Sequence, residues 1–318
     1  MKKLVLSANM AIVGVFLMVG MAFAQTVPGA PATGMSAPAS GGSPVTVIAG
    51  DSGSADVGGW APGFVQSLYS NWSKAYGWTP TQPIAIHLYE GGHDFAYGVS
   101  ALNGSPLTST ELSSLAASGI SGITVSTPRG MAIAFNLAAS DFGSPIGGAY
   151  WMTQAKGALA EQLAMVMLQD TAGTGGSPWL RQGLADYLAN TAVPGIQSVF
   201  TRSQAYNMAV GQKLAPDVLS INQDWTSLTS GTPTTSITAP TAIELRDAAF
   251  WEADQTVGYL VSRVGAPKVV DMLKMASSGQ NFETVLQSTT GLTLNALNSA
   301  MPTFQGMGMM TTAGAGGM

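Results

Sequence analysis

The sequence predicts an α+β fold in which a small strand-bearing N-terminal lobe is followed by a mostly helical C-terminal lobe. The segments with strand-like alternation lie before residue 140, and from residue 149 onward apolar residues recur at helical spacing almost to the end. Hydrophobic residues make up 46% of the chain and the formal net charge is only −5. This composition favours a packed domain over a disordered chain.

The N-terminus predicts a secretory signal peptide over residues 1–24. Two lysines follow Met1, an apolar run comes next, and the small residues Ala22 and Ala24 flank Phe23 at the exit. A retained membrane anchor is the less favoured alternative, because the apolar run is shorter than the ~20 residues that a spanning helix needs. We therefore expect a protein that is secreted or held in the periplasm or cell envelope, with no membrane span after signal cleavage.

Composition then divides the mature chain into three parts. Residues 25–45 are rich in Pro, Gly, Ala and Ser and predict a flexible linker. Residues 46–302 predict the folded domain. Residues 303–318 predict a disordered tail rich in Gly and Met. The thioethers of Met307, Met309 and Met310 have a spacing that suits a soft ion such as Cu(I), although a low-complexity terminus is the favoured interpretation.

In the N-terminal lobe we expect one helix and three strands. Phe64, Val65, Leu68 and Trp72 have helical spacing, and glycine and proline follow at positions 77 and 80. The expected strands alternate apolar and polar residues and contain many strand formers. They cover residues 84–89, 123–126 and 131–137, the last two joined by a turn at 128–130.

In the C-terminal lobe the pattern is helical, with Gly and Pro between the helices. The helices are predicted at about 150–170, 178–191, 241–264, 266–277 and 281–289. Met301 and Pro302 are expected to close the fold.

Composition also excludes some classes of function. Charged residues make up only 9% of the chain with a mildly acidic balance, so no basic surface for nucleic acid is expected. The chain has no cysteine, so packing must stabilise it without disulfides and no thiol nucleophile exists.

The most specific pattern spans two predicted helices and the Gly-rich turn between them. The first helix contains Leu159-Ala160-Glu161-Gln162-Leu163-Ala164-Met165, and the second begins Pro178-Trp179-Leu180-Arg181-Gln182-Gly183-Leu184-Ala185-Asp186-Tyr187. This segment resembles the active site of the gluzincin (peptidase MA-like, zincin-fold) metallopeptidases. In that family the first helix carries H-E-x-x-H and the second is similar to P-x-W-L-x-E-G-L-A-x-Y.

Later segments add to the resemblance. Residues 256–265 resemble the family's Y-L-x-x-x-x-G pattern, and residues 281–286 and 290–292 resemble its F-E-x-A-L-like helix and T-G turn. The resemblance implies a zincin-like α+β domain over roughly residues 46–302.

The same resemblance implies that the zinc chemistry has been lost. Glu161 stands where the first His ligand belongs, Gln162 replaces the general base, Met165 replaces the second His, and Gln182 replaces the third ligand. A carboxylate and a thioether together make a poor zinc site, and an amide cannot act as a base near neutral pH. We therefore expect zinc to be absent and assign no catalytic residue, cofactor or metal ligand.

Asp186 is the remaining acidic residue of this motif. In the family a carboxylate at this place can orient the first zinc ligand from behind. If Asp186 faces Glu161, the two carboxylates could share a proton or bind a hard cation such as calcium. In the favoured alternative Asp186 turns to solvent or to a helix terminus, and Glu161 pairs with Lys156, Arg181 or water.

The chain has only two histidines. His87 lies in a strand pattern and is expected to be a core or edge imidazole with a satisfied hydrogen bond. His93 is expected on a solvated loop or at a helix start. A role for either as a metal ligand is the less favoured interpretation.

The sequence thus predicts an exported, catalytically inactive metallopeptidase homologue. We expect it to bind peptide, protein or cell-envelope material through the former substrate cleft. Two alternatives stay open. One is a hydrolase with rebuilt chemistry, using either Glu161 and Asp186 as an acid pair or a metal displaced to His87 or His93. The other is a purely structural envelope or assembly protein.

Overall fold

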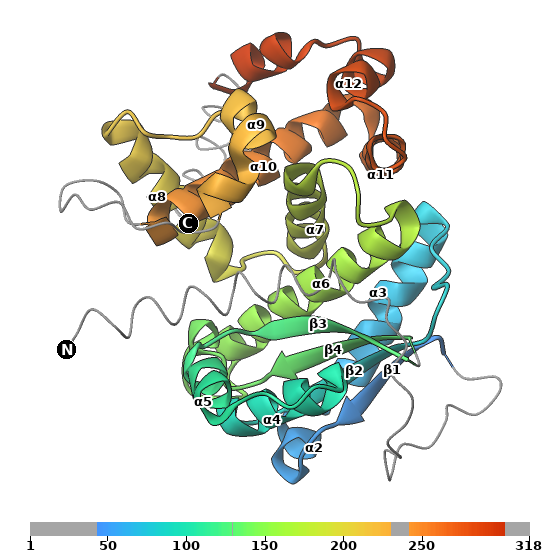
Figure 1. The fold of residues 1–318 in the computed structure, drawn as a ribbon, viewed down its shortest axis with the longest axis vertical. Helices are drawn as coiled ribbons and strands as arrows, with labels where there is room; N and C mark the ends of the chain where they lie inside the picture. The colour runs from blue at the N-terminus through green and yellow to red at the C-terminus, as the bar shows by residue number, and fades with distance from the viewer. Residues whose placement is uncertain (1–42, 129, 230–241, 303–318) are drawn as a thin grey trace, which may run out of the picture. The chain divides into compact units, whose positions relative to one another are not determined.

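The computed structural model describes residues 43–128, 130–229 and 242–302 (Figure 1). These residues form two compact units, one over 43–70 and 80–140 and the other over 71–79 and 141–302. The signal peptide, most of the linker, Arg129 of the 128–130 turn and the Met-rich tail lie outside the described residues. None of the helices in the described ranges is long and apolar enough to cross a bilayer.

The first unit is built on one four-stranded mixed sheet with the order β1-β2-β4-β3. Strands β1 (Val45–Ala49), β2 (Ile84–Tyr89) and β4 (Gly130–Asn136) run parallel, and β3 (Gly122–Thr127) pairs antiparallel with β4. The three predicted strands are confirmed. The first described strand, β1, starts where structure was expected to start but was not predicted to be a strand.

Helices connect the parallel strands, as a crossover requires. Helices α2 (Ser52–Val57) and α3 (Ala61–Tyr76) lie between β1 and β2 in the chain, and α4 (Gly92–Asn103) and α5 (Ser109–Ala117) lie between β2 and β3. Helices α4 and α5 cover one face of the sheet (Figure 1). Their buried side chains form one cluster with the sheet: Tyr89, Phe95, Ala96, Val99, Leu115 and Ala134.

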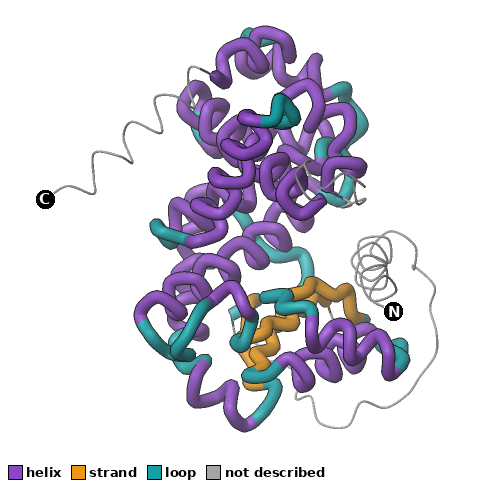
Figure 2. The backbone as a smooth tube through the Cα atoms, turned by 90° about the vertical axis from the view of Figure 1, so that its left-hand side faces the viewer, coloured by secondary structure: helices purple, strands orange, loops and turns teal. Residues whose placement is uncertain are grey.

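The second unit is helical in the residues described, apart from its connecting loops (Figure 2). A short 3-10 turn, η1 (Ser140–Phe142), follows β4 and leads toward it. Its helices are α6 (Ala149–Ala172), α7 (Pro178–Ala192), α8 (Gln197–Gly211), α9 (Val218–Thr229), α10 (Ala242–Val264), α11 (Ala266–Ser277) and α12 (Phe282–Thr290). Residues 294–302 are also helical. The α+β class and the change from strands to helices along the chain are confirmed, whereas α8 and α9 were not predicted.

Helices α6, α7 and α10 form the middle of the second unit. Helix α7 packs against both α6 and α10, and α10 also packs against α8 and α9. The side chains between them are fully buried, among them Leu159, Leu163, Leu184, Val257 and Leu260. Trp179 closes the start of α7 by packing edge-on against Phe282, with ring centroids 5.2 Å apart.

Gly183 sets the distance between α7 and α10. A Cβ atom at this position would lie 2.5 Å from the carbonyl oxygen of Ala253 and 2.8 Å from Cγ2 of Val257. Real Cβ atoms do not approach backbone so closely, so only glycine allows this packing. The glycine of the motif therefore has a packing role one residue away from Gln182.

We expect Gly183→Ala to destabilise the protein by about 1–3 kcal/mol, because overpacking outweighs the ~1 kcal/mol that alanine gains in a helix. Gly211→Ala is the matched control, since nothing lies within 4 Å of a Cβ there. It should leave stability unchanged or raise it slightly. Urea unfolding followed by circular dichroism measures both. Equal stability of the two variants would contradict the close packing of α7 on α10.

Candidate functional site

The motif residues lie on two helices that pack directly against each other. Glu161 is in the middle of α6, and Gln182 and Asp186 are one turn apart on α7. Helix α7 starts with Pro178, whose fixed φ and missing N–H suit a first helical position. Residues four apart on a helix share a face, so Gln182 and Asp186 point to the same side.

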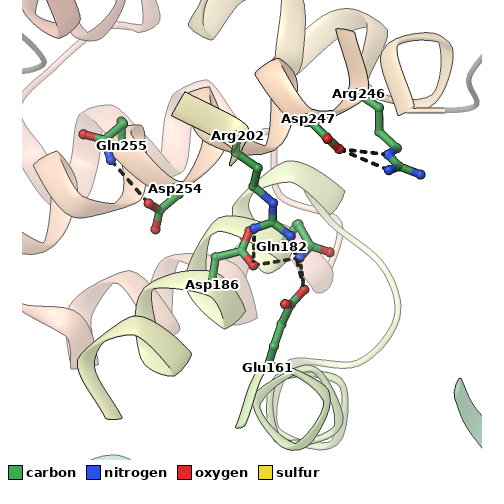
Figure 3. A network of polar contacts seen from close by, with 8 residues as sticks. All are labelled: Glu161, Gln182, Asp186, Arg202, Arg246, Asp247, Asp254 and Gln255. Carbon is green, nitrogen blue, oxygen red and sulfur yellow. Dashed lines mark hydrogen bonds and ion pairs between the residues drawn. The ribbon is translucent and has the colours of Figure 1, made fainter. Parts of the chain in front are cut away.

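Gln182 bridges the two carboxylates of the motif. Its Nε2 donates one hydrogen bond to Oε1 of Glu161 at 2.9 Å and another to Oδ1 of Asp186 at 3.2 Å (Figure 3). The motif resemblance implies that Glu161 and Gln182 stand at the positions of two ligands of one ion and that Asp186 stands behind them. The structure brings these three side chains together.

A cation from a third helix completes the cluster. Nη1 of Arg202, on α8, lies 2.8 Å from Oδ1 of Asp186, and its Nη2 lies 3.7 Å from Oε1 of Glu161 (Figure 3). The guanidinium carbon is 5.0 Å from the ring centre of Phe250, which stacks on Trp225. Arginine is thus held by carboxylates on one side and by an aromatic face on another.

The favoured prediction for Asp186 and Glu161 is wrong. Asp186 does not turn to solvent, because its side chain is only 2% exposed and pairs with Arg202. Glu161 bonds to Gln182 and Arg202, not to Arg181. Arg181 instead donates to the carbonyl oxygens of Gly173, Thr174 and Gly175 and so shapes the turn between α6 and α7. Because Asp186 is buried, its carboxylate needs a fully charged partner, which a helix terminus does not provide.

A further, half-buried carboxyl lies close enough on α10 to interact electrostatically with the same cluster. Burial raises the pKa of Asp254 to about 6, and the negative charge of Glu161 adds to this, while Arg202 and hydrogen bonds from Gln255 and Asn190 oppose it. Gln255 donates to Asp254 at 3.3 Å. A short way back on α10, Asp247 is paired with Arg246 at 3.1 Å (Figure 3).

The pKa values of Asp186 and Arg202 are both raised, as expected for a buried ion pair beside additional negative charge. Burial raises the pKa of Asp186 well above its usual range; Arg202 lowers it, whereas Glu161 and Asp254 raise it further. Burial alone would lower the pKa of Arg202, but Asp186 and Glu161 raise it above its ordinary value. Oδ2 of Asp186 is buried and has no hydrogen-bond partner among the described residues.

We call Glu161, Gln182, Asp186, Arg202 and Asp254 the Arg202 network. It holds three carboxyl groups and one guanidinium, so full ionisation would leave a buried excess of negative charge. The raised pKa values mean that folding favours a neutral carboxyl here. The positive charge between Glu161 and Asp186 is the guanidinium of Arg202, a partner that the sequence analysis did not consider.

The other motif residues are on the same helix as Glu161. Gln162 and Met165 are half-buried on α6, and Met165 lies one turn after Glu161. The family that the motif resembles holds zinc at this place, and the residues of this chain do not fit a zinc ion. A guanidinium stands among the donors, and neither His nor Cys contributes. In the described ranges of the chain, no three Asp, Glu or His side chains are grouped so that they could hold a metal ion.

Both histidines belong to the first unit. His87 is buried on β2, as expected of a core imidazole, and burial lowers its pKa. Its Nε2 has no hydrogen-bond partner among the described residues, so the expected satisfied imidazole is wrong for this nitrogen. His93 is exposed in the first turn of α4, as expected of a helix start.

Sequence reasoning missed Arg202 and Asp254. Arg202 is the single charged residue of the 15-residue helix α8, and the whole chain has only 12 Lys and Arg residues. The motif places two carboxylates at one half-buried position, and such a pair needs a cation nearby. Arg202, the lone arginine of a nearby polar segment, could have been identified as that cation from the sequence.

Two cavities in the described residues lie outside the Arg202 network. One, of about 280 Å³, is at the start of α7 beside Ser177, Asn222 and Phe282. The other, of about 410 Å³, is in the first unit beside His93 and Ser113. Neither includes a residue of the network, in which Arg202 fills the space between the carboxylates.

Comparisons with family models, with curated proteins and with solved structures gave no match to this chain. The resemblance to the gluzincins therefore rests on the motif residues themselves.

The raised pKa of Asp254 has a consequence for stability. Because its folded value of about 6 exceeds the ordinary 3.8, folding favours the neutral carboxyl. This contribution is complete below about pH 4 and is lost as the pH rises through 6. Asp254→Asn keeps the neutral form at every pH. We expect the variant to match the natural protein near pH 4 and to be more stable by about 1–3 kcal/mol near pH 7.5.

Denaturant unfolding of both proteins at the two pH values measures this difference. Comparing the variant with the natural protein at each pH cancels the titration of all other carboxylates. A stability difference that is the same at both pH values would contradict the raised pKa of Asp254 in the folded state.

Proposed function

We propose that this chain is an exported, catalytically inactive homologue of the gluzincin metallopeptidases. The observation that supports it most is the direct contact between Gln182 and Glu161 at 2.9 Å. The motif assigns these residues to two ligands of one metal ion, and two such ligands must approach each other. Asp186, assigned to a place behind the first ligand, joins the same network.

The chemistry of the side chains supports the loss of hydrolysis. A zinc peptidase needs nitrogen ligands for the metal and a carboxylate base for the metal-bound water. Here Met165 and two amides stand in those positions, and Arg202 brings a positive charge into the space that the metal would need. A guanidinium about 4 Å from a zinc ion would repel it strongly in a half-buried site.

The proposed role is binding. We infer that the protein binds peptide, protein or cell-envelope material through the region that forms the substrate cleft in the family. Of the alternatives, an acid-pair hydrolase is disfavoured by geometry. The side chain of Asp186 is 2% exposed, and both carboxylates are engaged by Gln182 and Arg202, so neither is free to act on a substrate.

The natural protein is expected to purify with much less than one zinc per chain and to show no chelator-sensitive peptide hydrolysis. Metal analysis and an assay with a mixed peptide library measure both properties. Stoichiometric zinc together with cleavage that a chelator abolishes would overturn the proposal. Hydrogen exchange around residues 161–187 with added peptides tests the binding role separately, since a purely structural protein would show no protection.

Rebuilding the site tests the motif register. We expect Glu161→His, Gln162→Glu, Met165→His and Gln182→Glu together to create only a weak zinc site, because Arg202 still stands in it. Adding Arg202→Ser should raise zinc affinity at least about tenfold by removing the like charge. Isothermal titration with zinc measures both variants.

The control for the fifth substitution is Arg246→Ser in the same fourfold background, since Arg246 is paired with Asp247 outside the zinc position. It should not change zinc affinity. If the fourfold and fivefold variants both fold and neither binds zinc, the motif has been placed in the wrong register.

A further inference from the structure

A pocket of about 280 Å³ lies at the start of α7, in the second unit, and shares no residue with the Arg202 network. The start of α7 supplies Ser177 and Pro178, and α9 supplies Asn222. The connection after α11 supplies Gln280, and α12 begins at the pocket with Phe282. Ligand pockets usually measure ~300–1,000 Å³, so this one has room for a small molecule.

The hydroxyl of Ser177 is a buried polar group that the fold leaves without a partner. Ser177 is 8% exposed, and its Oγ has no hydrogen-bond partner among the described residues. A serine just before the first turn of a helix ordinarily accepts a hydrogen bond from an N–H of that turn, but the side chain of Ser177 does not cap α7. A buried hydroxyl without a partner costs free energy, and an acceptor bound in the pocket that Ser177 lines would remove this cost.

The other polar groups at the pocket also offer hydrogen-bond donors. Oδ1 of Asn222 accepts the indole N–H of Trp179 at 3.1 Å, so the NH₂ group of its amide is left for a further acceptor. The N–H groups of Trp179 and Leu180 are in the first turn of α7, where no helical carbonyl can accept them, and the side chain of Ser177 does not replace one. This end of a helix also favours negative charge.

The acceptors close to the pocket are already engaged. Carbonyl oxygens in the last turns of α11 accept the N–H groups of Ser278, Gly279 and Gln280. In the turn before α7, the carbonyl oxygens of residues 173–175 accept the guanidinium of Arg181. Among the described residues that line the pocket, none is charged. The pocket therefore combines neutral donors with the positive end of a helix.

We propose that the pocket at the start of α7 binds the carboxylate of a small organic acid. Ser177, Asn222 and the first-turn N–H groups of α7 donate to the carboxylate oxygens, and Pro178 and Phe282 cover the apolar part of the ligand. Neutral donors suit a singly charged carboxylate, whereas a phosphate is more often held by Arg or Lys. The inference goes beyond the proposed function, because it holds for any ancestry of the motif.

Titration with sodium butyrate at constant ionic strength, with sodium chloride as the balancing salt, tests the pocket. The indole N–H signal of Trp179 in a ¹H–¹⁵N NMR spectrum reports on Asn222, to which it is bonded, and Trp179→Phe assigns it. This signal should shift until it saturates, with a dissociation constant of about 10⁻³ M, because a ligand with so few atoms binds weakly. Inorganic phosphate should bind at least about tenfold more weakly, since no Arg or Lys lines the pocket.

Two variants separate a binding role from a structural one. Ser177→Ala should weaken butyrate binding about five- to tenfold, and its melting midpoint should stay the same or rise, because no cap hydrogen bond is lost. Asn222→Asp keeps an acceptor for Trp179 and places a negative charge in the pocket, so binding should no longer be detectable. The matched control is Asn207→Asp, which makes the same change of charge on the exposed side of α8 and should bind butyrate like the natural protein.

The proposal is overturned if the natural protein gives no saturable shift, if phosphate binds as tightly as butyrate, or if Ser177→Ala binds butyrate unchanged. A lower midpoint of Ser177→Ala with unchanged binding leaves the serine a structural role only. Should Asn222→Asp not fold, Ser177→Ala against the natural protein decides. None of these outcomes depends on zinc or peptide hydrolysis, so the proposed function can fail independently.

Discussion

The ion pair between Asp186 and Arg202 is the interaction on which the second unit depends. A carboxylate that is almost fully buried on α7 is tolerable only with a close partner, and Arg202 provides one at 2.8 Å. This requirement fixes the place of α8, whose other buried side chains include the small Ala205 and Ala209. Such small residues bury little apolar area. The ion pair with Asp186 on α7, the contact of Arg202 with Phe250 and the close packing against α10 together hold α8 in place.

A resident arginine differs from a metal in what it does to folding. A metal site forms only when the ion is bound, so stability follows the metal concentration. Arg202 is covalently part of the chain and has lost only side-chain freedom on entering the site. Its Nη1 contacts Oδ1 of Asp186 at 2.8 Å, and Phe250 supports the guanidinium from an aromatic face. The remaining negative charge makes protonation of the cluster easier, because burial raises the pKa values of Asp186 and Asp254.

The parts of the fold that the sequence revealed are those in which burial leaves a periodic pattern. Helices α6, α7 and α10 bury long apolar side chains at helical spacing, and the central strand β2 is apolar at most positions. Helix α8 lacked this signal, because its buried face carries Arg202 and alanines while Phe200 and Met208 are exposed. The motif identified Glu161, Gln182 and Asp186. It did not identify their partner Arg202, because Arg202 lies on a helix that hydrophobic periodicity did not detect.

Contact between two residues on neighbouring helices is common. A group of partly buried polar side chains packed beside buried leucines is less common. Leu163, Leu180 and Leu184 flank the motif positions and are fully buried. At such a place apolar residues would stabilise the helix pair without any desolvation cost, whereas Glu161, Gln182 and Asp186 need each other and Arg202 to be tolerated. Packing alone gives no reason for this polar cluster, and a former ligand site is the origin that we propose for it.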